Sequence, residues 1–375
     1  MVYLDYAATH PLLPSVKKAM VEAMDEFFAN PSALHTPGHL AKNQIEHARE
    51  LLARLINASP EEIIFTSGAS ESNNTAIHIF AGQNMAISEI EHHSVLLPAT
   101  KYSTSVTPVK VDKTGKMCYN EKIWGNRPKL LSIGLVNNEL GTISDLAFWS
   151  KAAHTHHCYI HSDMTQALGK IDIDVKKLDV DYATFSAHKI GGPVGIGALY
   201  VRKGTPFTPL ILGGNQEDKR RGGTHNVIAA VGFGAALDFI AKNRTPELYQ
   251  HQVRILRDQL ANRILREIPG SSLNSTPDAS PNILNVSFEA AEGESIQLYL
   301  DAEGIIVSTG SACAAGDLKP SHVLMATNND AERAHSSIRF SLGLDTTEED
   351  INKVMAVLPG IIKKLQGMST VKMKG

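Results

Sequence analysis

Residues 181–201 read DYATFSAHKIGGPVGIGALYV, in which two apolar runs flank a glycine-rich turn. Both runs have the pattern of buried strands. Lys189 follows the first run, after Ser186 and His188. Most lysines extend into water, but this one lies between an apolar strand and glycines that let other backbone come close. A partly desolvated lysine can form a Schiff base, so Lys189 is a candidate catalytic residue.

The segments on either side of this stretch alternate between helical and strand patterns. Apolar residues spaced three or four apart predict helices over residues 14–28 and 41–57. The short apolar runs that predict strands are residues 62–68, 84–92, 129–139, 157–163, 182–189 and 196–202. This alternation predicts an α/β fold with a mostly parallel sheet covered on both faces. Ligands of such sheets bind at the carboxyl ends of the strands.

The pattern changes near residue 245. A long helix is predicted over 245–268, followed by strands at 282–289 and 304–311 and a closing helix at 347–366. These segments indicate a smaller α+β domain. We therefore expect a large domain over residues 13–245, and a small domain that joins residues 1–12 to residues 246–375.

Composition excludes several classes of protein. The 375 residues carry a net charge of −3, which provides no basic surface for nucleic acid or an anionic membrane. No apolar run reaches the roughly 18–20 residues of a membrane span. Three cysteines are too few for a disulfide framework, and the first residues read as strand and loop rather than as a signal peptide. We expect a cytoplasmic protein.

Three strand ends carry polar residues with more than one possible role. Gly68, Ala69 and Ser70 stand between a strand and a helix, which suits either a phosphate site or an ordinary helix cap. Asp163 could pair with a protonated ring nitrogen of a cofactor or cap a helix. Arg339, in an apolar strand, could form a structural salt bridge or bind a substrate carboxylate.

Two cysteine-containing stretches lead to different expectations. Residues 154–161, HTHHCYIH, are rich in metal-ligand types, but Cys158 and His161 should face different ways on a strand, so we expect no metal site. Residues 308–322, STGSACAAGDLKPSH, surround Cys313 with small side chains that would not bury it. An accessible thiol is a candidate nucleophile if a nearby group stabilises the thiolate.

A long series of segments, in order along nearly the whole chain, resembles one known family. The segments are YLDYAAT, NPSALH, FTSGASESNN, EHHSV, VNNELGT, HSDMTQALGK, FSAHKIGGPVGIGALYVR, RGGT, PNILNVSF, GES, STGSAC, PSHVL and AHSSIRFSLG. Together they resemble the cysteine desulfurases, pyridoxal-phosphate enzymes of fold type I in the class-V aminotransferase family. The loop after Cys313 is similar in length to that of the iron–sulfur and nitrogen-fixation branch.

The resemblance implies conversion of L-cysteine to L-alanine, with the sulfur left as a persulfide on Cys313. Its cofactor would be pyridoxal 5′-phosphate, bound by the large domain, while the small domain would carry the cysteine loop. The implied catalytic residues are Cys313, Lys189 and His92. The implied cofactor-binding residues are Lys189, Ala69, Ser70, His92, Asn138, Asp163, Gln166, Ser186, His188 and Thr224. Asn138 and Arg339 would bind the substrate carboxylate.

The resemblance also implies partners. Thr224 and Arg221 lie on a loop that in this family serves the phosphate of the neighbouring subunit, so we expect a homodimer. A sulfur-acceptor or iron–sulfur scaffold protein would collect the sulfur. Two alternatives stay open: a selenocysteine lyase or related lyase, which depends less on Cys313, and a non-catalytic assembly platform. The chain departs from the family pattern at Ala187, at Gly222, and at the two alanines after Cys313.

Overall fold

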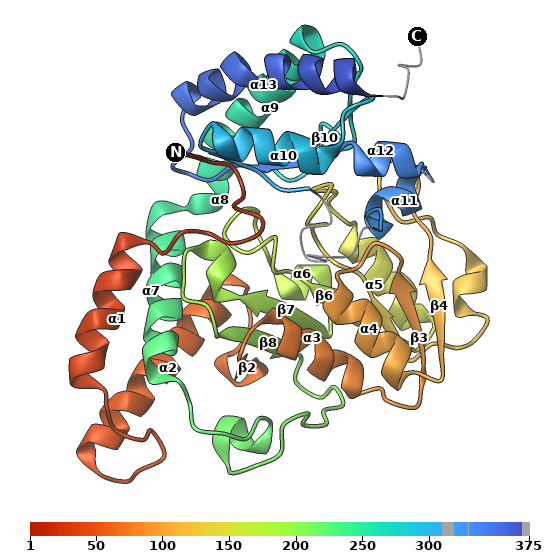
Figure 1. The fold of residues 1–375 in the computed structure, drawn as a ribbon. Helices are drawn as coiled ribbons and strands as arrows, with labels where there is room; N and C mark the ends of the chain where they lie inside the picture. The colour runs from red at the N-terminus through yellow and green to blue at the C-terminus, as the bar shows by residue number, and fades with distance from the viewer. Residues whose placement is uncertain (310–318, 329, 370–375) are drawn as a thin grey trace.

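A seven-stranded sheet forms the centre of the protein in the computed structural model, which describes residues 1–309, 319–328 and 330–369 (Figure 1). Its strands are β2 (Ile63–Thr66), β3 (Asn84–Ser88), β4 (Ser105–Val109), β5 (Leu130–Ser132), β6 (Tyr159–Asp163), β7 (Tyr182–Ser186) and β8 (Gly197–Val201). Their spatial order is β2-β8-β7-β6-β5-β3-β4. The last five strands of this order are parallel, whereas β8 runs antiparallel to both β2 and β7. The predicted α/β fold with a mostly parallel sheet is therefore confirmed.

Helices cover both faces of this sheet, because successive side chains of each strand point to opposite sides. In β3, Ala86 belongs to one buried cluster and Met85 and Ile87 to another. The first cluster includes side chains of α2 (Thr36–Leu55), α5 (Leu146–Thr155) and α7 (Val227–Asn243). The second includes side chains of α3 (Ala69–His78) and α4 (His93–Tyr102). Both faces are thus buried, which explains why the strands are apolar throughout.

The remaining elements before residue 250 are short or lie at the edge of this sheet. They are α1 (Pro14–Glu26), which packs on α7, α6 (Val175–Leu178), α8 (Thr245–Leu248) and the 3₁₀ turns η1 (Pro60–Glu62), η2 (Glu121–Trp124), η3 (Ala187–Ile190) and η4 (Gln216–Lys219). The predicted helix over 14–28 is α1, and the one over 41–57 is the later part of α2.

The C-terminal part of the chain builds two small sheets and a separate buried cluster. One sheet has the antiparallel order β12-β10-β9, with β9 (Ser271–Leu273), β10 (Ile283–Phe288) and β12 (Ser337–Ser341). In the other, β1 (Val2–Tyr3) pairs in parallel with β11 (Ile305–Ile306), so the first residues join the last third of the chain. The helices are α9 (Arg254–Glu267), α10 (Gly293–Ala302), α11 (His322–Asn328), α12 (Ala331–His335) and α13 (Glu348–Met368). Helices α9, α10 and α13 pack together above the large sheet (Figure 1).

The predicted helix over 245–268 is not one regular helix. It consists of α8, a π-helical turn η5 (Tyr249–Val253) and α9. The closing helix over 347–366 is present as α13. Buried side chains of β1, α9, β10, α10, β12 and α13 share one cluster. The division into domains at residues 12/13 and 245/246 stays a prediction.

Within residues 1–309, 319–328 and 330–369, no helix combines the length and apolar character that crossing a bilayer requires.

Candidate active site

A cavity of about 490 Å³ opens at the carboxyl ends of the parallel strands. The last residues of β3, β6 and β7 all line it: Ser88, Asp163 and Ser186. The predicted site residues that line it are Ala69, Ser70, His92, Asn138, Asp163, Gln166, Ser186, His188, Lys189 and Arg339. The structure thus brings together side chains separated by up to 270 positions along the chain. Cys313 lies outside the described residues.

Lys189 follows β7 within the η3 turn, as the sequence placed it. Its Nζ donates to the backbone oxygens of Ala7 and Ala8 at 2.6 and 2.7 Å. The expected close approach of backbone beside the glycines also occurs. A Cβ added at Gly197 would lie 2.7 Å from the backbone of Gly68, so only glycine allows β8 to meet the start of α3 there.

Asp163 and His92 are each fixed by short-range hydrogen bonds. The Asp163 carboxylate accepts from Nδ2 of Asn73 at 2.7 Å and from the backbone N–H of Thr165 at 2.9 Å. Nδ1 of His92 accepts from the backbone N–H of Ser94 at 3.1 Å. A neutral His92 ring therefore carries its proton at Nε2. Burial lowers the pKa of His92, with Lys189 adding to this effect and Asp163 opposing it.

The start of α3 has the features of an anion site. Its N-cap residue, Gly68, provides no side-chain cap, so the first helical N–H groups do not have the partner that a serine or aspartate would supply. A Cβ at Gly68 would meet no atom within 4 Å, which shows open space on that side. Helix N-termini attract phosphate through these N–H groups and the helix dipole. Of the two roles that the sequence allowed, the side-chain cap is absent at Gly68, and the anion site stays a prediction.

His188 lies on the same side of the cavity. Its Nδ1 is 3.1 Å from Oγ1 of Thr9. Burial, together with the charges of Lys189 and Lys170, lowers the pKa of His188 to about 4. The ring is therefore neutral at pH 7 and can donate or accept a single hydrogen bond.

Arg339 is buried in β12 and forms the structural salt bridge that was one of its two expected roles. Its Nη2 donates to Oδ1 of Asp5 at 2.7 Å, and its Nη1 donates to the backbone oxygen of Asn138 at 3.0 Å. Its Nε is buried and has no hydrogen-bond partner among the described residues. The guanidinium is therefore oriented by protein contacts at the wall of the cavity, where its positive charge could pair with a substrate carboxylate.

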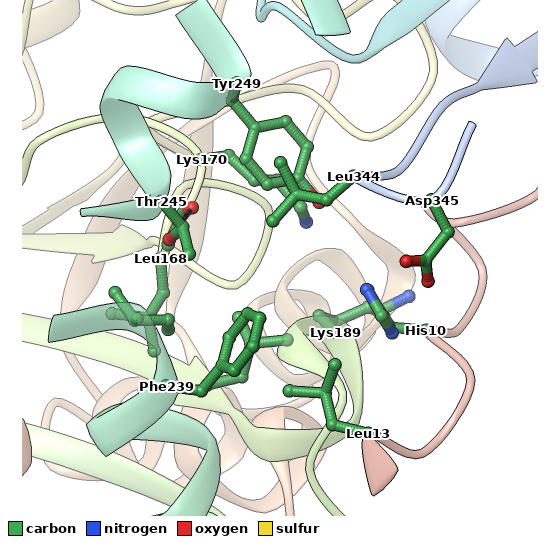
Figure 2. A pocket seen from close by; sticks show the side chains of 13 residues that line it. His10, Leu13, Leu168, Lys170, Lys189, Phe239, Thr245, Tyr249, Leu344 and Asp345 are labelled. Carbon is green, nitrogen blue, oxygen red and sulfur yellow. Dashed lines mark hydrogen bonds between the residues drawn. The ribbon is translucent and has the colours of Figure 1, made fainter. Parts of the chain in front are cut away.

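Sequence reasoning missed a buried lysine next to the cavity. Lys170 is fully buried and its Nζ lies 3.4 Å from Oε1 of Gln166, whose Nε2 donates to the backbone oxygen of Ala7 at 2.8 Å. Figure 2 shows the side chains of Lys170, Lys189 and Tyr249 around a second, smaller cavity of about 40 Å³. Burial lowers the pKa of Lys170 to about 7, and the charges of Lys189 and Arg339 act in the same direction.

Two buried glutamates were missed as well. Glu91 lines the large cavity, and burial raises its pKa to about 8 although the bonds from Gly134 and Ser88 oppose the shift; Asp163 adds to it. Glu139 accepts from Oγ of Ser321 at 2.6 Å, and burial raises its pKa to about 7 although this bond and Arg339 oppose the shift. Glu91 directly precedes His92, and Glu139 directly follows Asn138. Because His92 and Asn138 were both predicted for the site, this adjacency was the available signal for the two glutamates.

Thr224 is the one predicted cofactor residue among those described that does not line the large cavity. It lies with Arg221 and His225 at a separate cavity of about 180 Å³. Arg221 pairs there with Glu71, with Nε 2.9 Å from Oε1. One subunit alone therefore does not bring Thr224 to Lys189.

Three of the four histidine rings in residues 154–161 have separate partners. His154 contacts Asp179 and Asp181, His156 stacks on Trp124, and His161 contacts Ser132 and Thr184. Cys158 is buried, and burial raises the pKa of its thiol to about 12, so it stays protonated. These contacts of the described residues in the stretch are structural.

The large cavity fits pyridoxal phosphate, a flat pyridine that carries a phosphate arm. It offers a carboxylate at Asp163, an amine at Lys189 and the start of α3 as an anion site. Oγ1 of Thr165 also lines it and is buried with no hydrogen-bond partner within the described part of the chain. An unpaired buried hydroxyl is costly unless a ligand satisfies it. The volume is in the range of small-molecule and cofactor sites.

Comparison with known proteins gives consistent matches over the whole chain. The class-V aminotransferase family profile matches residues 2–354. The cysteine desulfurase IscS of Dictyoglomus turgidum is 44% identical over 383 aligned residues, covering 99% of this chain and 97% of that protein. Cysteine desulfurase IscS 1 of Archaeoglobus fulgidus is 42% identical, covering 98% and 99%.

Solved structures agree with these sequence matches. A NifS-like protein from Rickettsia africae superposes with a TM-score of 0.88 at 32% identity, covering 97% of this chain and 99% of that one. The structure of SspA in complex with cysteine superposes with a TM-score of 0.79 at 34% identity, covering 91% and 99%.

Proposed function

Because the chain belongs to the class-V aminotransferase family, among its cysteine desulfurases, we propose that it converts L-cysteine to L-alanine. The sulfur atom passes to Cys313 and leaves a persulfide there. The observation that carries this proposal is the meeting of Lys189, Asp163 and His92 in one buried cavity at the strand ends.

Pyridoxal 5′-phosphate is the proposed cofactor, and when bound it withdraws electrons from the substrate Cα. Asp163 would hold the ring nitrogen, Gln166 the ring hydroxyl, and His92 the face of the ring. The residues proposed for the phosphate are Ala69, Ser70, Ser186 and His188, with Thr224 of the partner subunit.

Lys189 is proposed to bind the cofactor covalently and then to act as the base at the substrate Cα. Its Nζ already lies against the carbonyl oxygens of Ala7 and Ala8. These acceptors keep a released amine close to the cavity, where it can take a proton from carbon and return it.

Arg339 and Asn138 are proposed to orient the substrate through its carboxylate. The salt bridge to Asp5 and the bond to the Asn138 carbonyl hold the guanidinium in one position. A substrate anchored there keeps its Cα–H bond in a constant direction, which lowers the entropy cost of proton transfer.

The sulfur step balances without an added oxidant or reductant. The Cys313 thiolate forms an S–S bond with the substrate sulfur while the substrate Cβ–S bond breaks, and the carbon receives a proton. L-Alanine leaves, and Cys313 holds the persulfide for an acceptor. A sulfur-acceptor or iron–sulfur scaffold protein is the proposed recipient.

A homodimer is part of this proposal. Thr224 lies away from the large cavity of its own chain, which suits a residue that serves the neighbouring site. Large apolar side chains are also exposed along α1 and before α2, including Val21, Met24, Phe28 and Leu34. Exposed apolar clusters of this kind mark protein contacts. The two-domain division and a cytoplasmic location remain parts of the proposal that come from the sequence.

The test is to trap the persulfide by mass spectrometry after adding L-cysteine to the cofactor-loaded protein. We expect a mass increase of one sulfur on the peptide that contains Cys313, absent in Cys313→Ala. Cys118→Ala is the matched control, because Cys118 is an exposed free cysteine and its loss should leave the persulfide unchanged.

Two outcomes would select the alternatives. Full sulfide release by Cys313→Ala would indicate a lyase. If added cofactor gave no visible absorbance band, or one that Lys189→Ala did not change, a non-catalytic platform would be favoured.

A further inference from the structure

Glu91 joins three parts of the cavity wall. It lies between the end of β3 and the start of α4, directly before His92. Its Oε1 accepts from the backbone N–H of Gly134, which follows β5, at 2.7 Å. Its own backbone oxygen lies 2.9 Å from Nε2 of His322 in α11. The residue that precedes His92 is therefore held through both its side chain and its main chain.

The glycine at position 134 makes this contact possible. A Cβ there would lie 3.3 Å from Oε2 and 3.5 Å from Oε1 of Glu91. The carboxyl group thus lies directly against the backbone, where a larger residue would press on it. The contact of Glu91 with Gly134 connects the residue before His92 to the segment that follows β5.

Glu91 is buried, with only 5% of it exposed, and forms no ion pair within the described part of the chain. Titratable and charged groups that line the same cavity or contact this segment are Glu71, His92, His93, Asp163, His188, Lys189, His322 and Arg339. Of these, Asp163 shifts the pKa of Glu91, and it shifts it upward because the two charges are alike.

We propose that Glu91 is a positioning residue for His92 and that it does this work as a protonated carboxyl group. Two carboxyl groups in one dry cavity cannot both ionise at low cost, and Asp163 has the donors that stabilise a carboxylate. Glu91 accepts one backbone N–H and keeps its proton. Ionisation would add a second negative charge to the wall and loosen the segment that leads to His92.

This inference rests on the proposed function at one point only, which is that His92 contacts a bound cofactor. The protonated state of the buried Glu91 carboxyl group is a property of the protein itself and does not require the cofactor. It can be measured as the carbonyl stretch of a protonated carboxylic acid in the infrared spectrum of the cofactor-free protein.

The experiment compares wild type with Glu91→Gln, Glu91→Ala and Glu89→Gln. The side-chain amide of the Glu91→Gln variant keeps an acceptor for Gly134 and cannot ionise, so it mimics the neutral acid. Glu89 is the matched control, because it lies two residues earlier and its Oε2 pairs with Nζ of Lys110 at 2.7 Å. Each protein is titrated from about pH 6 to pH 10, with the infrared bands and the visible band of bound cofactor as readouts.

We expect the wild type and Glu89→Gln to lose two protonated-acid bands, one from Glu139 with a midpoint near pH 7 and one from Glu91 with a midpoint near pH 8, since burial raises both pKa values. Glu91→Gln should lack the Glu91 band and bind cofactor normally over the whole range. Glu91→Ala leaves the Gly134 N–H unpaired and should bind cofactor about tenfold more weakly.

The results separate the two ideas. A wild type that keeps the Glu91 infrared band but binds no cofactor would contradict the proposed function alone. A band near pH 8 that is unchanged in Glu91→Gln, or cofactor binding by Glu91→Ala equal to wild type, would overturn the assignment of Glu91.

Discussion

Glu217 and Glu91 are both buried glutamates, but the first faces an arginine and the second does not. The Glu217 carboxylate accepts from the two Nη atoms of Arg49 at 2.7 and 2.8 Å and contacts Nε2 of His225 at 2.7 Å. Burial by itself would raise the pKa of Glu217, but the bonds from Arg49 and His225 outweigh it and lower the pKa to about 2. At Glu91, burial outweighs the hydrogen bonds from Gly134 and Ser88 and, with a smaller contribution from Asp163, raises the pKa to about 8.

The two pKa shifts differ because the region around Glu217 holds the fold together, whereas the region around Glu91 lines the cavity. The chain at Glu217, Asp218 and Lys219 has φ angles of 48°, 53° and 66°, a left-handed run that ordinary residues adopt only when they are anchored. The Arg49–Glu217 pair provides this anchor. In the cavity, Glu91 and Lys170 are buried without an oppositely charged partner among the described residues. A titratable group buried without such a partner favours its neutral form, and its presence at a cavity is typical of functional sites.

The largest expected effect comes from the cavity. Lys189→Ala should reduce desulfurase turnover by about 10²–10⁴-fold, because the base at the substrate Cα is lost. The free energy of unfolding of the cofactor-free protein should change by less than about 2 kcal/mol. Turnover is measured as alanine formation, and unfolding by urea titration. A loss of folding that matched the loss of turnover would contradict the contrast between the two regions.

The paired region should respond in the opposite way. Glu217→Gln leaves the Arg49 guanidinium buried without its carboxylate, so the free energy of unfolding should fall by about 3–5 kcal/mol. Glu46→Gln is the matched control, since Glu46 also contacts Arg49, at 3.0 Å, but is 44% exposed. Its loss should cost less than about 1 kcal/mol. Equal effects of the two variants would show that the buried pair is not the anchor.

The sequence predicted those site residues that stand at the ends of strands. Lys189, Asp163 and His92 each follow a short apolar run, and parallel strands bring such positions to one edge of a sheet. The α/β fold was predictable for the same reason, because the runs alternate with amphipathic helices. The reversed direction of β8 was not predicted, since an apolar run has the same pattern in either direction.

The buried charges could not be predicted from local patterns. Glu217 lies 168 positions from Arg49 along the chain, and Lys170 follows an apolar turn in which a lysine reads as a surface residue. Glu91 stands in the segment SEIEH, where only its position next to His92 distinguishes it from the more accessible Glu89. Burial of a charge depends on which distant segments cover it, and only the folded structure contains this information.

The pH dependence of stability should distinguish the two glutamates. The pKa of Glu91 is raised on folding, so between its ordinary value of 4.5 and about 8 the folded protein holds a proton that the unfolded chain releases. Stability from this group is complete below pH 4.5 and falls by about 1.4 kcal/mol for each pH unit as the pH rises through the window. Relative to Glu91→Gln, the wild type should lose about 2 kcal/mol between about pH 6 and pH 7.5.

Glu217 should contribute nothing over that range. Its pKa is lowered on folding to about 2, so its contribution is fully present above its ordinary value of 4.5 and is lost as the pH falls toward 2. Urea titrations of Glu91→Gln, Glu217→Gln and wild type at both pH values provide the measurement. A wild-type loss of stability equal to that of Glu91→Gln would mean that Glu91 is ionised in the folded protein.

The smallest expected effect comes from comparing two serine–glutamate hydrogen bonds of equal length, one buried and one near the surface. Oγ of Ser321 donates to the buried carboxyl of Glu139 at 2.6 Å, and Oγ of Ser295 donates to Glu292 near the surface at the same distance. Ser321→Ala leaves a buried acceptor without its donor and should lower the free energy of unfolding by about 1 kcal/mol or slightly more. Ser295→Ala should change it by less than about 0.5 kcal/mol, because water replaces the lost bond.

Since the Ser321 bond lowers the pKa of Glu139, its removal should also raise that pKa above about 7 and steepen the loss of stability at neutral pH. If both variants had the same effect at every pH, burial would not be the factor that separates these carboxyl groups.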